Sequence, residues 1–157
     1  MTNELQLLIE ALEKKKRILE EILEKSKEQN VIANAKSFDA ESFDRLVDEK
    51  TGLLEQMDLT DSGFDAIFKT IRDELLANRA SYKQEIGDMQ RLIKETVDLG
   101  AQICASESRT KESMSAALGN RRHELIKQKV SSKSVKDYYK ANTQLDYLVP
   151  YFIDQKK

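Results

Sequence analysis

The stretch FDAIFKTIRDELLANRASYKQEIGDMQRLIKETVDLGAQICASESRTKESMSAALGNRRHELIKQKVS, from Phe64 to Ser131, decides the fold predicted for this chain. It contains no proline, and its apolar side chains recur every three or four residues over most of its length. This spacing is typical of one face of an α-helix. As one straight helix the stretch would be about 100 Å long, which is longer than a compact chain of this size is wide. We therefore predict an elongated helical protein.

The composition supports long helices and excludes several other classes. The chain has 157 residues, of which 34% are charged, with a single proline (Pro150) and no tryptophan. β-branched and aromatic residues are too sparse for alternating strands, and the apolar runs are too short for a membrane span. The N-terminus has no pattern of a secretory signal. Cys104 is the one cysteine, so we expect no disulfide, a small packing role for this residue and a cytoplasmic setting.

Two further helices are predicted before the long one. The first covers about residues 3–34 and carries one apolar stripe, and its basic cluster Lys14–Arg17 is expected to form a solvated face because acidic residues flank it. The second covers about 39–58, with Asp39 as the N-cap residue. Phe38 and Phe43 have the spacing of a hydrophobic staple around this cap.

A polar turn at residues 58–63 should separate the second helix from a third helix over 64–131. The predicted fold is therefore all-α: an elongated antiparallel three-helix bundle or coiled coil, residues 1–131, with a very long third helix. Residues 132–157 are predicted to form a flexible tail that is rich in basic and aromatic residues.

The length of the third helix predicts a surface that has no partner within the chain. Running parallel to the first helix, it can pair over about residues 64–93, and a helix that continues without support is only marginally stable in water. Beyond residue 100 small residues dominate, with scattered apolar side chains at Ile103, Met114, Leu118, Leu125, Ile126 and Val130. Three interpretations remain open: a self-association surface, a docking surface for a partner helix, or a solvated end.

The C-terminal tail differs in charge from the rest of the chain. Residues 1–63 carry 9 basic and 15 acidic side chains, whereas residues 119–157 carry 9 basic and 4 acidic ones. Four of the five tyrosines lie in the tail, among them Tyr138 and Tyr139, and Leu148 and Phe152 flank Pro150. Aromatic anchors in a polar segment indicate a linear interaction segment. The alternative is that residues 148–153 fold back onto the bundle.

No pattern of residues indicates catalysis or cofactor binding. His123 is the one histidine and there is no cysteine pair, so we expect no metal site. Phosphate-binding loops and nucleophile–base motifs are also absent from the sequence. We expect no enzymatic activity, no cofactor and no catalytic residue. Nucleic-acid binding is not favoured either, because acidic residues are interspersed among the basic ones in the tail.

The sequence resembles the FlgN family of flagellar export chaperones, in the form found in clostridia-like bacteria. The resemblance covers the Leu-, Lys- and Glu-rich first helix, the segment after Phe38-Asp39, the Asp-Ser-Gly-Phe motif at residues 61–64 and the tail. In the tail the matching motifs are Tyr138-Tyr139-Lys140 and the end of the chain from Phe152 to Lys157.

This resemblance implies a cytoplasmic chaperone of flagellar type III protein export. Such proteins bind hook–filament junction proteins, and we expect the contact to be with C-terminal helices of these clients, which are then delivered to the export gate. Tyr138 or Tyr139 is the implied contact with the gate. The implied client-binding positions are Met114, Leu118, Leu125, Ile126 and Val130. The alternative function is a structural coiled-coil spacer or scaffold that forms a homodimer through the end of the third helix.

Overall fold

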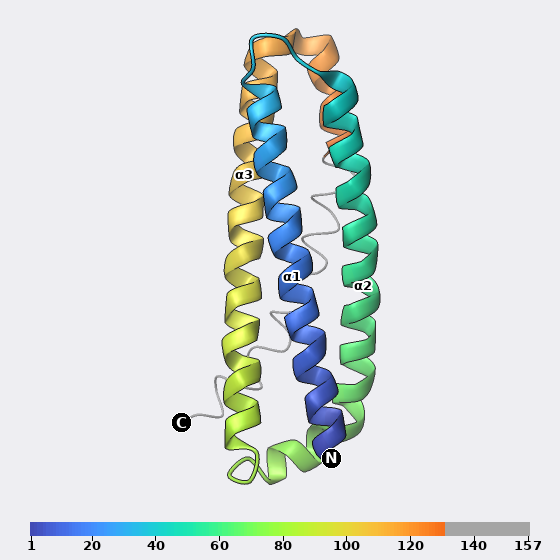
Figure 1. Ribbon diagram of the computed structural model, residues 1–157, viewed down its shortest axis with the longest axis vertical. Helices are drawn as coiled ribbons and strands as arrows, with labels where there is room; N and C mark the ends of the chain where they lie inside the picture. Colours follow the sequence, from blue (N-terminus) through green and yellow to red (C-terminus); the bar gives the residue numbers. More distant parts are fainter. Residues whose placement is uncertain (131–157) are drawn as a thin grey trace.

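The computed structural model contains three long helices in the order up, down, up (Figure 1). It describes the backbone of residues 1–130 and the side chains of residues 1–116. Helix α1 covers Thr2–Ala33, α2 covers Ala40–Ala77 and α3 covers Lys83–Val130. The described residues are thus all-α, with a third helix of 48 residues, which confirms the predicted fold class.

Helix α1 and the start of α2 lie where local signals place them. The observed bounds of α1 differ from the prediction by one residue at each end. At Asp39, Oδ1 accepts a hydrogen bond from the Ser42 amide at 3.1 Å, which is the expected N-cap contact. The rings of Phe38 and Phe43 pack with centroids 5.5 Å apart, as in a hydrophobic staple.

The predicted turn at residues 58–63 is wrong, because α2 continues through it to Ala77. Met57 and Phe64 are both buried on the same face of α2, and between them Asp61 forms an ion pair with Lys15 of α1. The polar residues of this segment therefore do not end the helix. Their side chains either face solvent or find a partner on α1.

The chain instead reverses at residues 78–82, inside the stretch predicted as one helix. The Asn78 side chain donates to the carbonyl of Glu74 at 2.9 Å and so caps the end of α2. Two turn hydrogen bonds follow, from the Ser81 amide to Asn78 and from the Tyr82 amide to Arg79. Leu75 before the turn and Met89 after it belong to one apolar cluster, so the helical spacing of apolar residues continues although the chain changes direction.

The core consists of three apolar clusters along the bundle. The first contains Leu8, Phe68 and Met89, the second Ile22, Leu54 and Ile103, and the third Ala33, Phe43 and Met114. Each cluster combines side chains from all three helices. Burial of these side chains supplies the main favourable free energy of the fold.

Candidate functional site: buried polar layers and the end of α3

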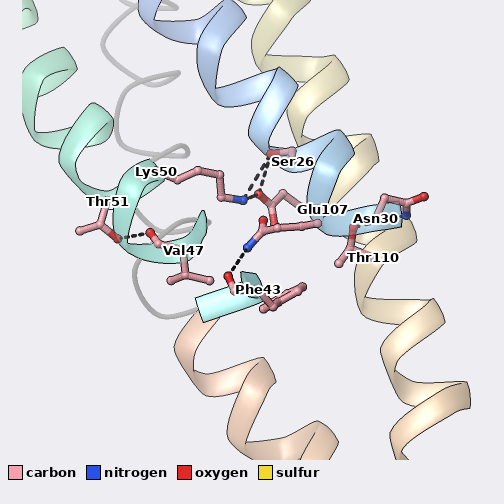
Figure 2. Close-up of polar contacts among 9 residues, drawn as sticks. Ser26, Asn30, Phe43, Val47, Lys50, Thr51, Glu107 and Thr110 are labelled. Atoms are coloured by element: carbon pink, nitrogen blue, oxygen red, sulfur yellow. Dashed lines mark hydrogen bonds and ion pairs between the residues drawn. The ribbon is translucent and has the colours of Figure 1, made fainter. Parts of the chain in front are cut away.

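A layer of polar side chains separates the second and third apolar clusters. Lys50 of α2 and Glu107 of α3 form an ion pair through Nζ and Oε1 (Figure 2), and their side chains are 0% and 4% exposed. Ser26 of α1 completes the layer. Its hydroxyl donates to Glu107 Oε1 at 3.1 Å and accepts from Lys50 Nζ at 3.3 Å. Each helix therefore contributes one member of this layer, which we call the Lys50 layer.

Further polar contacts surround the Lys50 layer on the side of α1. The Gln29 side-chain amide donates to the carbonyl oxygen of Phe43 at 3.4 Å. The Asn30 amide donates to the Thr110 hydroxyl at 3.3 Å, and Figure 2 shows both side chains beside the layer. These contacts tie α1 to α2 and α3 at the same level of the bundle.

A second buried ion pair separates the first and second apolar clusters. Lys15 Nζ of α1 contacts both carboxylate oxygens of Asp61 of α2, at 2.8 and 2.9 Å. The Lys15 side chain is 2% exposed. The expectation that residues 14–17 form a solvated face is therefore wrong for Lys15.

Burial dominates the electrostatics of both layers. Desolvation lowers the pKa of Lys50, and the charge of Glu107 opposes this shift. Desolvation likewise lowers the pKa of Lys15 and raises the pKa of Asp61, while their mutual attraction acts in the opposite direction on both. A buried charge is tolerated only with a close, hydrogen-bonded partner, so each pair depends on both of its members.

The Lys50 layer has one polar atom without a partner. Glu107 Oε2 is buried and makes no hydrogen bond with another described residue. A buried oxygen of this kind costs free energy unless a donor reaches it.

Chemically, the layers are suited to fixing the helix register rather than to catalysis. Their lysines and carboxylates are paired with one another and closed off from solvent. Among the residues that the structure describes, no three histidine, cysteine, aspartate or glutamate side chains gather as a metal site would require. No helix in the described part of the chain is both long and apolar enough to span a membrane.

The structure places two of the predicted partner-binding residues in the interior. Ile103 is 0% exposed in the second apolar cluster, and Met114 is 2% exposed in the third. The prediction of an unpaired surface that begins near residue 93 is therefore wrong for these two positions. Because α2 ends at Ala77 rather than near residue 58, α3 begins 19 residues later than predicted and pairs with α1 further along its own sequence.

The remaining predicted residues lie beyond the side chains that the structure describes. Leu118, Leu125, Ile126 and Val130 are in the last part of α3. Tyr138, Tyr139, Leu148 and Phe152 lie outside the described residues, as does the predicted tail.

Helix α3 continues past the ends of its two neighbours. Asn30 of α1 is level with Thr110, so Ala33, at the end of α1, is level with about residue 113. From Ser115 to Val130, α3 comprises about four further helical turns. Figure 1 shows this last part of α3, in orange, turning across the end of the bundle near the α1–α2 connection.

The sequence contained a signal for the buried Lys15–Asp61 pair that the prediction did not use. Lys15 occupies a position in the stripe formed by Leu8, Leu12 and Leu19, at helical spacing. A lysine inside an apolar stripe requires a buried acid, but the sequence does not say which one. Asp61 and Glu107 become identifiable as partners only when the helices are in register.

Comparison with known proteins identifies no relative: no family model, no curated protein and no solved structure matches this chain. A function is therefore inferred from the residues of the chain and their arrangement.

Proposed function

We propose that this protein is a cytoplasmic chaperone of flagellar type III export that binds the C-terminal helices of hook–filament junction proteins and delivers them to the export gate. The observation that carries the proposal is the continuation of α3 from Ser115 to Val130, past the level at which α1 ends. The side chains Leu118, Leu125 and Ile126 on this extension are the proposed client contacts. Tyr138 or Tyr139 is the proposed contact with the gate.

The exposed side chains of the bundle favour a binding site at the C-terminal end of α3 rather than along the sides of the three helices. Among the described side chains, the large exposed hydrophobic residues are Leu7, Val31 and Leu59. They lie far apart on α1 and α2, and single exposed apolar side chains are normal for a soluble protein. A partner helix that docks by its apolar face needs a continuous apolar groove, which is to be sought at the end of α3.

The choice of client comes from the sequence resemblance to FlgN-family chaperones. The Asp-Ser-Gly-Phe motif at residues 61–64 lies within α2 rather than at the start of a helix. The motifs that support the proposal most directly are therefore those of the C-terminal segment, Tyr138-Tyr139-Lys140 and Phe152 to Lys157.

The test is a binding measurement with purified hook–filament junction proteins from the same organism. We expect the full chain to bind a peptide from the C-terminal helix of such a protein in calorimetry. A chain that ends at Leu118 should lose binding and yet keep its helical circular dichroism and cooperative unfolding, because all three apolar clusters lie before this point. Undiminished affinity of the shortened chain would contradict the proposal.

A matched pair of substitutions in the full chain makes the test independent of truncation. Leu125→Asp should weaken client binding at least tenfold, whereas Glu124→Gln at the neighbouring position should not change it.

Light scattering with and without the client distinguishes the chaperone from the alternative spacer. A stable homodimer that forms no client complex would favour the spacer.

A further inference from the structure

The two lysines that interrupt apolar stripes in this bundle each face an acidic side chain of another helix. Lys15 lies in the apolar stripe of α1 and pairs with Asp61 of α2. Lys50 lies in the apolar stripe of α2 and pairs with Glu107 of α3. Burial of a cation between helices requires such a partner. A basic residue within an apolar stripe therefore indicates a carboxylate on the helix that packs against it.

The same pattern recurs in the sequence at the end of α3. The backbone is helical as far as Val130, so spacing along the sequence gives the positions that share one face. Met114 is buried in the third apolar cluster. At spacings of three or four residues, its face continues through positions Leu118, Arg122, Leu125 and Lys129. Two basic positions therefore interrupt the apolar positions of this face.

Helix α1 cannot supply the matching carboxylates. Asn30 of α1 is level with Thr110 of α3, so the last acidic residue of α1, Glu28, is level with about residue 108. In the connection that follows α1, the carboxylate of Asp39 is engaged by Ser42 at the start of α2. The acidic residues of α1 thus end well before the level of the two basic positions.

Helix α3 itself offers no matching carboxylate in the positions that allow pairing within a helix. Ion pairs within a helix form between residues three or four positions apart, as Arg91 and Glu95 do in the body of α3. Neither Arg122 nor Lys129 has an aspartate or glutamate at such a position. A helix that packs on this face must therefore bring carboxylates of its own.

We propose that the partner helix bound at the end of α3 carries two carboxylates within its apolar stripe, which pair with Arg122 and Lys129. These positions are seven residues, or about 10.5 Å, apart, so the two carboxylates lie about two turns apart on the partner. The inference rests on the proposed function for the place of the site and adds the chemistry of the partner.

The mixture of basic and apolar positions on one face favours a protein helix over other acidic partners. A helix that lies on a membrane keeps its basic residues on the face opposite its apolar one. Nucleic acid is bound mainly through its phosphates, which give no role to the apolar positions Leu118 and Leu125. An acidic amphipathic helix matches both kinds of position at once.

The test uses the full chain and three designed amphipathic peptides of equal length with the same leucine stripe. At two stripe positions seven residues apart, the first peptide has glutamate, the second glutamine and the third lysine. Calorimetry at low ionic strength should show at least tenfold tighter binding of the glutamate peptide than of the glutamine peptide, and no binding of the lysine peptide. Added salt should reduce the difference, because it screens the charges.

Two matched substitutions locate the contact on one face of α3. Lys129→Glu should weaken binding of the glutamate peptide at least tenfold. Lys127→Glu makes the same change in net charge two positions away, on the opposite face of the helix, and should weaken binding less than twofold. The double substitution Arg122→Glu with Lys129→Glu should reverse the preference, so that the lysine peptide binds and the glutamate peptide does not.

Several outcomes would overturn the proposal. They are absence of binding by the glutamate peptide, equal binding of the glutamate and glutamine peptides, and equal losses from Lys127→Glu and Lys129→Glu. Binding of duplex DNA or of phosphatidylglycerol vesicles that depends on Lys129, without binding of the glutamate peptide, would assign the face to nucleic acid or to a membrane instead.

The same variants separate this inference from the proposed function. If peptides from junction proteins bind equally well to the full chain and to Lys129→Glu, the chaperone function stands and the acidic partner is refuted. If the glutamate peptide binds and the junction-protein peptides do not, the proposed client is refuted and the acidic partner stands.

Discussion

Lys50 illustrates how much one residue can decide in this bundle. Its neighbours in the buried stripe of α2, Val47 and Leu54, are apolar, and its own side chain is fully buried. The ion pair with Glu107 makes this burial tolerable, because an unpaired charge in the interior costs far more than a paired one. Replacing one member of the pair should therefore be much worse than replacing both.

We predict that Lys50→Met destabilises the protein by about 3–5 kcal/mol, the cost of leaving one member of a buried ion pair without its partner. The double substitution Lys50→Met with Glu107→Leu should recover most of this loss, because apolar side chains of similar volume fill the layer. Urea unfolding at pH 7, followed by circular dichroism, measures both.

The control for this prediction is Lys25→Met, which removes the partly exposed ion pair with Glu49. Water screens such a pair, so the effect should be much smaller. If Lys50→Met were as mild as Lys25→Met, the Lys50 layer would not have the importance that we assign to it.

Asp39 gives a prediction for the dependence of stability on pH. Hydrogen bonds from Ser42 hold the pKa of its carboxyl below the ordinary value of 3.8. Because the folded-state pKa is depressed, the charged carboxylate stabilises the fold at pH values above 3.8, and this contribution is lost as the pH falls through the folded-state pKa. Asparagine at this position keeps the acceptor for the Ser42 amide but cannot ionise.

The melting temperature of Asp39→Asn should thus lie below that of the wild type at pH 7, and the difference should shrink toward pH 2. Thermal unfolding of both proteins over this pH range measures it. A difference that stays constant with pH would mean that the charge of Asp39 does not contribute.

At the scale of the helices, local sequence patterns predicted the capped start of α2 correctly but did not predict where the chain reverses direction. Asp39 and the Phe38–Phe43 staple placed the start of α2 correctly, because a cap involves only neighbouring residues. Residues 58–63 have the composition of a turn but are helical, and the real turn is at 78–82. The burial of Met57 and Phe64 on α1 outweighs the weak helix propensity of the residues between them.

We predict that Gly63→Ala stabilises the protein by about 0.5–1 kcal/mol, the usual gain from replacing glycine within a helix. Gly63 lies in the middle of α2 and is exposed to solvent, and an added Cβ would meet no atom of a more distant residue within 4 Å. Thermal or urea unfolding measures the change.

Gly52→Ala is the matched comparison, because it also lies within α2 and also has open space for a Cβ. Similar gains at both positions are expected from one continuous helix. A loss of stability for Gly63→Ala alone would indicate that the chain turns at residues 58–63.

For the whole molecule, the two buried layers determine how the helices align. A slip of α3 by one heptad would place Gly100 or Met114 at the position of Glu107 and leave Lys50 buried without a carboxylate. A similar slip between α1 and α2 would separate Lys15 from Asp61. Buried polar groups of this kind can select one register at a cost in stability. The alignment in turn sets which residues of α3 lie level with the end of α1.

The sequence by itself determined the helical class, the bounds of α1 and the cap of α2, because spacing and capping act among residues close together in the chain. The tertiary structure decided where α2 reverses into α3, which charges are buried and which residues of α3 lie level with the end of α1. Lys15 with Asp61 and Lys50 with Glu107 are 46 and 57 residues apart. Apolar periodicity is unchanged by a reversal of direction, so only the packing of α2 and α3 on α1 could distinguish one long helix from two.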